Sequence, residues 1–144
     1  MTLIHATCVA IDGQGVLLRG PSGSGKSDLA LRLIERDAAL IADDQVALAV
    51  EDGDLWATAP ASLRGLLEVR GVGLVRQPAA GRAPVRLVVD LVAADQVPRL
   101  PEAGQCDIAG VRLPCYRLHA LQASAPAKLR LLLRACREPV IASP

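Results

Sequence analysis

Residues 20–27 constrain this chain more than any other segment. They read Gly-Pro-Ser-Gly-Ser-Gly-Lys-Ser and match the phosphate-loop pattern G-x-x-x-x-G-K-[ST] in full. The run 16–19 before them has the composition of a strand, and residues 27–36 after them have the apolar spacing of a helix. Because a strand, a glycine-rich turn and a helix in this order form the usual context of a phosphate loop, the sequence predicts an α/β fold that binds a nucleoside triphosphate.

The residue types in this loop have a chemical reason. Glycines allow consecutive backbone N–H groups to curl toward phosphate oxygens, and the helix N-terminus adds a partial positive charge. Lys26 is placed to reach the outer phosphates, and the Ser27 hydroxyl is placed to bind Mg²⁺. The predicted nucleotide-binding residues are Gly20, Pro21, Ser22, Gly23, Ser24, Gly25, Lys26 and Ser27. The motif alone does not say where the phosphoryl group goes.

Composition narrows the class of protein. A length of 144 residues predicts one domain spanning 1–144, and 51% apolar residues suffice for a buried core. The formal net charge of +1 gives no reason to expect a nucleic-acid or membrane partner. Trp56 and Tyr116 are the only aromatic residues, so stacking platforms for single-stranded nucleic acid are not expected.

The cysteines and the chain start indicate a reducing compartment. No pair among Cys8, Cys106, Cys115 and Cys136 has CxxC spacing, so we interpret them as small buried hydrophobic residues rather than metal ligands. The first residues lack the basic region of a signal peptide, and no stretch approaches a membrane span. A soluble cytoplasmic protein is therefore expected.

The hydrophobic pattern predicts a mixed sheet with only two clear helices, as in an α/β or α+β protein. Strands are expected at 2–11, 16–19, 38–42, 45–50, 55–59, 63–69, 85–92 and 111–118, and helices at 27–36 and 126–137. Residues 63–69 alternatively form a helical turn followed by a strand. Residues 70–73 are expected to bend, and residues 77–84 (QPAAGRAP) to form a mobile loop.

Phosphoryl transfer needs a carboxylate to hold metal and a group to orient or deprotonate the acceptor. Asp43 and Asp44 follow a short apolar run, so they are expected at the sheet edge that also carries the phosphate loop. Taken alone, Glu68 reads as a surface residue and His5 as a buried core histidine. Arg99, like Arg70, is either a surface residue or a group that stabilises phosphate charge.

Four features in order resemble the catalytic domain of bacterial HPr kinase/phosphorylase. They are His5 on the strand before the loop, the loop GPSGSGKS, the stretch LIADD at 40–44, and LEVRGVG at 67–73. The resemblance covers residues 5–99 and implies a P-loop kinase domain with a mixed β-sheet, similar around its nucleotide site to phosphoenolpyruvate carboxykinases. It implies an ATP-dependent serine kinase that phosphorylates HPr, the phosphocarrier of the sugar phosphotransferase system, and that can also remove that phosphate.

The resemblance also implies roles for individual residues. Asp44 would accept the proton of the serine, Lys26 would hold the transferred group, and His5 and Arg99 would be active-site residues. Ser27 and Glu68 would serve Mg²⁺, supported by Asp43. A cytoplasmic homo-oligomer, a hexamer in the family, is expected.

The chain departs from the family pattern in several places, among them a short loop at 77–84 and C-terminal helices that look truncated. Because the sequence begins close to His5, we expect no extra N-terminal domain of the kind that full-length members carry. The chain has Ala6 where the family has glycine, and residues 123–128 stand where the family has a Pro-Gly-Arg-Asn stretch tied to dephosphorylation. Kinase chemistry is therefore better supported than phosphorylase chemistry, and the pattern resembles the short alphaproteobacterial form. Two alternatives stay open: a non-catalytic regulator gated by nucleotide, and a small kinase of a metabolite in which Arg99 and Arg112 hold an anionic substrate.

Overall fold

The computed structural model describes residues 1–100 and 104–142. In chain order the elements are β1 (Thr2–His5), β2 (Thr7–Ile11), β3 (Gln14–Arg19), α1 (Lys26–Ile34), β4 (Ala39–Ala42), β5 (Gln45–Glu51), β6 (Asp54–Thr58), a 3-10 turn (Ala61–Leu63), β7 (Leu66–Val69), β8 (Gly73–Arg76), β9 (Ala83–Leu91), a second 3-10 turn (Ala94–Gln96), β10 (Gly104–Ile108), β11 (Val111–Leu118) and α2 (Ala125–Ala135). The mixed α/β fold expected from the sequence is confirmed.

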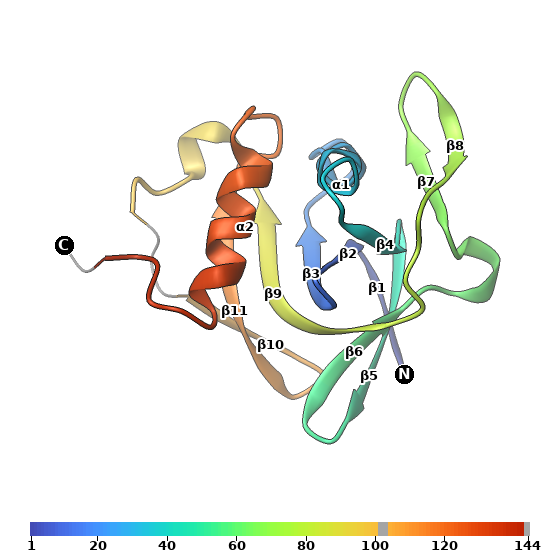
Figure 1. Ribbon diagram of the computed structural model, residues 1–144, viewed down its shortest axis with the longest axis horizontal. Helices are drawn as coiled ribbons and strands as arrows, with labels where there is room; N and C mark the ends of the chain where they lie inside the picture. The colour runs from blue at the N-terminus through green and yellow to red at the C-terminus, as the bar shows by residue number, and fades with distance from the viewer. Residues whose placement is uncertain (101–103, 143–144) are drawn as a thin grey trace.

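The long strand β9 organises the sheet. Its first residues pair with β6, and its remaining length pairs in parallel with β3 on one side and β11 on the other. Within the described ranges nine strands form one mixed, curled sheet in the order β1-β5-β6-β9-β3-β2-β4, with β10 and β11 branching from β9. The hairpin β7–β8 stands apart from this sheet and rises beside α1 (Figure 1).

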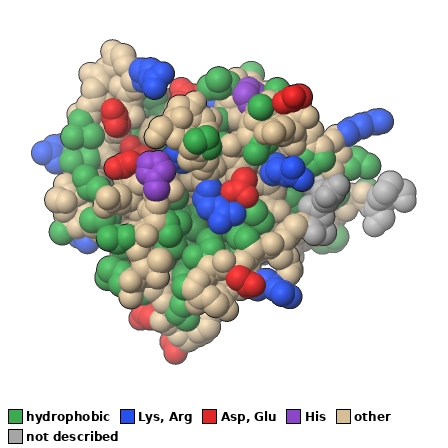
Figure 2. Space-filling view, turned by 180° about the vertical axis from the view of Figure 1, so that it is seen from behind, with side chains coloured by type: hydrophobic (Ala, Val, Ile, Leu, Met, Phe, Trp, Pro, Cys, Tyr) green, Lys and Arg blue, Asp and Glu red, His purple; other side chains and the backbone are tan. Residues whose placement is uncertain are grey.

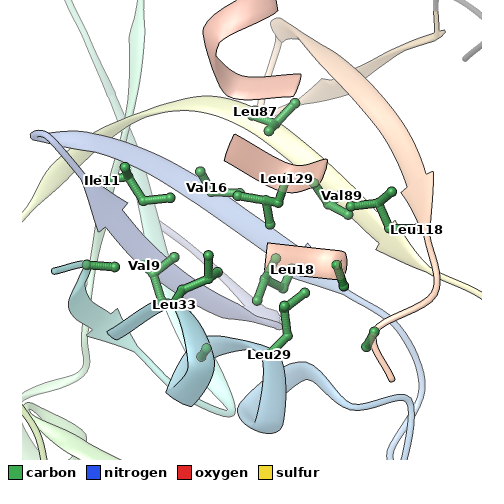
Figure 3. Packing of buried hydrophobic residues seen from close by; sticks show 14 of the residues in the cluster. Val9, Ile11, Val16, Leu18, Leu29, Leu33, Leu87, Val89, Leu118 and Leu129 are labelled. Atoms are coloured by element: carbon green, nitrogen blue, oxygen red, sulfur yellow. The ribbon is translucent and has the colours of Figure 1, made fainter. Parts of the chain in front are cut away.

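Strands buried on both faces give the molecule two hydrophobic clusters. Neighbouring side chains on β3 alternate, so Val16 and Leu18 point to one cluster while Leu17 points to the other. In the first cluster, Leu29 of α1 and Leu129 of α2 pack on these strands (Figure 3). Fully burying each such leucine contributes about 1.5–3 kcal/mol, so the two helices are fixed to the same face of the sheet.

The phosphate loop lies between the end of β3 and the start of α1. Gly25 precedes α1 with a φ of 96°, a left-handed conformation that an L side chain rarely adopts. A Cβ at this position would lie 2.8 Å from the Cβ of Ala120, in the connection between β11 and α2. Both constraints require glycine here. Ala120, which is distant in the sequence, packs directly against the loop at Gly25.

Several sequence expectations are wrong in detail. The strand expected at 2–11 is broken at Ala6, whose N–H donates to the Asp44 carbonyl, because β1 turns away to pair with β5 while β2 pairs with β3 and β4. The segment 77–84 is not a free loop. Leu40 in β4 exchanges backbone hydrogen bonds with Pro78 and Ala80, and β9 already begins at Ala83.

Other boundaries shift by a few residues. The helices span Lys26–Ile34 and Ala125–Ala135, and the alternative for 63–69, a helical turn and then a strand, is confirmed. Strands β8 and β10 were not expected, since their sequences carry glycine and polar residues. Of the four free cysteines only Cys8 is fully buried; Cys106, Cys115 and Cys136 are partly exposed.

The surface gives no single strong charge signal on the face shown in Figure 2, where acidic and basic side chains are interspersed with hydrophobic ones. Neither helix in the described part of the chain has the length and apolar character that crossing a bilayer requires.

Candidate active site

A cavity of about 520 Å³ opens beside the phosphate loop. It is lined by the loop and the start of α1, by the strand ends that carry the predicted acids, and by the turn of the β7–β8 hairpin. The lining side chains include His5, Thr7, Ser22, Lys26, Ser27, Asp28, Asp43, Asp44, Glu68, Val69, Arg70 and Leu121. The structure therefore brings His5, Lys26, Ser27, Asp43, Asp44 and Glu68 together in one cavity, as the sequence analysis expects.

Asp43 lies at the centre of a hydrogen-bond network. The hydroxyls of Thr7 and Ser27 each donate to its Oδ1, both at 2.8 Å, and the backbone N–H of Glu68 donates to its Oδ2 at 3.1 Å. The side chain is 6% exposed. Because a buried carboxylate is costly without partners, these three donors explain how Asp43 is accommodated, and they join β2, α1, β4 and β7.

The donor set in the cavity fits Mg²⁺. The Ser27 hydroxyl, the Glu68 carboxylate and the Asp43 carboxylate supply oxygen atoms, which this hard cation prefers. No cluster of three or more His, Cys, Asp or Glu side chains within the described ranges could hold a metal ion by itself. A site of this kind suits Mg²⁺ that is bound by few protein groups and by the phosphates of a nucleotide.

Lys26 is the charged group of the loop. It is 8% exposed, and its Nζ donates to the carbonyl oxygens of Gly20 and Pro21 at 2.6 and 3.0 Å. Burial lowers the pKa of Lys26, and the nearby carboxylates of Asp43 and Asp44 partly oppose this change. The ammonium group is thus held at the loop by hydrogen bonds to carbonyls, where phosphate oxygens would be stronger partners.

Asp44 is an exposed acid of the cavity, with 65% of its side chain exposed. Its Oδ1 lies 3.3 Å from Nδ1 of His5, which the turn between β1 and β2 brings alongside. The backbone of Asp44 has a φ of 68°, a conformation uncommon for residues other than glycine. The two neighbouring acids have different surroundings, since Asp43 is buried and hydrogen-bonded whereas Asp44 is exposed beside His5.

The connection between β11 and α2 forms another wall of the cavity. Arg32 of α1 donates to the carbonyl oxygens of Ala120 and Gln122, the latter at 3.1 Å, and pairs with Asp28 at 2.9 Å. These bonds hold Leu121 at the rim of the cavity, where 65% of it is exposed. The loop 20–27 is therefore packed against a segment almost a hundred residues later in the chain.

Arg99 is not brought to this cavity. It lines a second cavity of about 450 Å³, between α2, β11 and the segment after β9, together with Arg117, Lys128 and Asp90. Arg70, which the sequence analysis named only as a possible phosphate contact, lies in the first cavity instead. Arg112 lies in neither cavity; its Nε is 4.0 Å from Asp107.

Sequence reasoning missed Thr7 and Leu121. Thr7 belongs to a run of strand-forming residues. The one sequence signal for it is a hydroxyl within an otherwise apolar strand. Leu121 had no local signal, because its place at the rim depends on the packing of Ala120 against Gly25.

Both the sequence and the fold are similar to those of known proteins. A family model described as the HPr Serine kinase C-terminal domain matches residues 1–127. The HPr kinase/phosphorylase of Streptococcus gordonii is 37% identical over 129 residues, covering 81% of this chain and 42% of that protein. The HPr kinase/phosphorylase of Streptococcus thermophilus is 47% identical over 75 residues, covering 51% of this chain and 24% of that protein.

A solved structure of the Hpr(Ser) kinase/phosphatase from Coxiella burnetii superposes with a TM-score of 0.85 at 27% identity, covering 95% of this chain and 97% of that one. The chain thus spans less than half the length of these two streptococcal relatives, while it matches nearly all of a solved chain.

Proposed function

Because the chain belongs to the HPr serine kinase C-terminal domain family, we propose that it transfers the γ-phosphoryl group of ATP to a serine hydroxyl of the phosphocarrier HPr. One observation carries this proposal: the phosphate loop, the exposed carboxylate of Asp44 and the carboxylate of Glu68 line one cavity. Binding of a nucleotide alone needs no acceptor base. A kinase needs one beside the phosphates, and Asp44 supplies it.

The nucleotide would be held by the loop 20–27. The start of α1 lines the cavity, where its backbone N–H groups would bind phosphate oxygens, and Lys26 adds a positive charge that its present carbonyl partners do not neutralise. Ser27 and Glu68, with Asp43 behind them, would hold Mg²⁺, which neutralises charge developing on the β- and γ-phosphates. The protein's own contribution is to fix these oxygen atoms and to exclude alternative orientations of the triphosphate.

The acceptor serine would approach from the solvent side, where Asp44 is exposed. Its hydroxyl oxygen forms a bond to the γ-phosphorus while the bond from that phosphorus to the β,γ-bridging oxygen breaks, and the serine proton passes to the carboxylate of Asp44. The transition state is loose, so proton transfer is late and an ordinary ionised carboxylate suffices. His5 contacts Asp44 and would orient the carboxylate toward the serine.

The test is to incubate the purified chain with ATP labelled at the γ-phosphate, Mg²⁺ and HPr. We expect label on a serine of HPr, located by mass spectrometry, and none on HPr in which that serine is replaced by alanine. Nucleotide binding without transfer would instead favour the non-catalytic regulator. Label on a small molecule added from a metabolite extract, but not on HPr, would favour the metabolite kinase.

The expectation of a homo-oligomer rests on the family resemblance alone. Size-exclusion chromatography with light scattering measures it directly, and a monomer that still phosphorylates HPr would show that assembly is not needed for the reaction.

A further inference from the structure

We propose that Thr7 is a positioning residue, which acts through Asp43 to set the Ser27 hydroxyl for a magnesium-bound triphosphate. This inference rests on the proposed function in one respect, since it assumes that the cavity binds nucleotide with Mg²⁺. It does not depend on which acceptor receives the phosphoryl group.

The placement of Thr7 follows from strand pairing. Thr7 lies opposite Leu18 of β3, and on its other side Cys8 lies opposite Ala42 of β4. Because β2 and β4 run antiparallel, the residue before Cys8 faces the residue after Ala42, which is Asp43. The Thr7 hydroxyl therefore reaches Oδ1 of Asp43 across the end of the strand pair, at 2.8 Å.

Packing alone does not explain a threonine at this position. The side chain is 0% exposed, and the rest of β2 is apolar and buried. Valine has nearly the same shape and the same preference for strands, so it would fill the space without burying a hydroxyl. Among the described residues, the partner of this hydroxyl is the carboxylate of Asp43. The hydroxyl thus serves that carboxylate.

Thr7 fixes the rotation of Asp43. With both hydroxyls on Oδ1 and the Glu68 N–H on Oδ2, one orientation of the carboxylate satisfies all three donors. Without the Thr7 hydroxyl, Oδ1 of Asp43 loses one of its two donors, and the carboxylate can turn toward the cavity. A buried acceptor that loses a partner is driven to find another.

The orientation of Asp43 in turn sets Ser27. The Ser27 hydroxyl uses its one proton in the bond to Asp43, so both oxygen lone pairs stay available for a cation. If Asp43 turns, the Ser27 hydroxyl loses this partner and rotates among its alternatives. Thr7 therefore acts as an outer-shell group, of the kind whose removal typically costs about 10–100-fold in metal affinity.

The experiment compares Thr7→Val with Thr7→Ser. Affinity for a fluorescent ATP analogue is measured by titration, with Mg²⁺ and with EDTA. We expect Thr7→Val to weaken binding about tenfold or more in Mg²⁺ and to leave binding in EDTA unchanged. Thr7→Ser keeps the hydroxyl and should restore the Mg²⁺-dependent part. If Thr7→Val does not fold, Thr7→Cys keeps a similar volume with only a weak donor and gives the same comparison.

A double-mutant cycle with Asp43→Asn tests the route of the effect. If Thr7 acts through Asp43, Thr7→Val should add little to the loss already caused by Asp43→Asn. The proposal is overturned if Thr7→Val binds the Mg²⁺ complex as tightly as the parent, or if it loses affinity equally with and without Mg²⁺ while its melting temperature falls. If Thr7→Val shows the expected loss of Mg²⁺-dependent binding but the parent chain does not phosphorylate HPr, the proposed function is refuted and this inference still holds.

Discussion

The cavity at the phosphate loop and the cavity beside α2 are similar in size and differ in how their walls are built. The cavity at the phosphate loop has a volume of about 520 Å³. Its lining residues are joined by hydrogen bonds to Asp43 that connect four elements. The cavity beside α2, about 450 Å³, is lined largely by apolar side chains such as Leu131 and Leu132. Volume alone does not separate them. The first cavity differs in having a buried carboxylate, Asp43, that accepts hydrogen bonds from three donors on separate elements.

Charge makes the same distinction. In the second cavity Asp90 is already paired with Arg19, whose Nε and Nη2 donate to the two carboxylate oxygens at 2.8 and 3.0 Å. In the first cavity Asp44 and Glu68 have no partner as strong as an arginine fork among the residues described. The acid of the second cavity is thus neutralised within the protein, whereas those of the first remain available to a ligand. The following predictions test this difference.

Asp44→Asn should give the largest effect. Asparagine tolerates the left-handed backbone at this position, and it removes both the proton acceptor and the negative charge that faces His5. We expect phosphorylation of HPr to fall by about 10²–10⁴-fold, the usual contribution of a general base. Affinity for Mg²⁺ and the ATP analogue should stay within about twofold, as for a surface substitution. Transfer at the parental rate would show that Asp44 is not the base.

Lys26→Ala should weaken nucleotide affinity by about 10–100-fold, since a hydrogen bond to a charged group contributes about 1.5–3 kcal/mol. The lowered pKa of Lys26 adds a pH dependence. Binding is strongest where the ammonium is protonated, and it weakens as pH rises through that lowered pKa. Fluorescence titration of the parent and of Lys26→Arg at increasing alkaline pH measures this effect. If the parent and Lys26→Arg show the same pH dependence of binding, that dependence arises from another group.

Arg70→Ala and Arg99→Ala form a matched pair, one in each cavity. Arg70→Ala should weaken binding of the ATP analogue severalfold, because it removes a positive charge from the wall of the phosphate cavity. Arg99→Ala should leave that affinity unchanged. The family resemblance gives Arg99 a role in transfer, so the rate of HPr phosphorylation is measured for both. Equal losses of nucleotide affinity would contradict the separation of the two cavities.

Asp90→Asn should give the smallest effect. The pair with Arg19 is about one-third exposed, so we expect a loss of about 1 kcal/mol in the free energy of unfolding, within the range for screened pairs. The pKa of Cys115 is raised to about 12. Burial is the larger cause, and the hydrogen bond to Asp90 is the next. Asp90→Asn should lower that pKa and speed alkylation of Cys115 at mildly alkaline pH. Cys8, buried elsewhere, is the control. If Asp90→Asn does not change the rate of Cys115 alkylation, burial alone accounts for the raised pKa of Cys115.

Local patterns predicted the phosphate loop and its neighbours well. The loop needs specific residue types at adjacent positions, and the strand before it and the helix after it follow from periodicity over short windows. Residues 43–44 at a strand end and the bend at 70–73 were predictable for the same reason. The expected strand at 2–11 failed because its two halves pair with different partners, which no local pattern records.

The sequence by itself determined the chemistry that is available: the phosphate loop, the paired acids, and the apolar runs that become strands. Only the tertiary structure decided which groups meet. It brought Thr7 to Asp43 across 36 positions and placed Arg70, rather than Arg99, beside the phosphate loop. The physical reason is that residue types and short-range periodicity act locally, whereas strand order and helix packing are set by burying apolar surface over the whole chain.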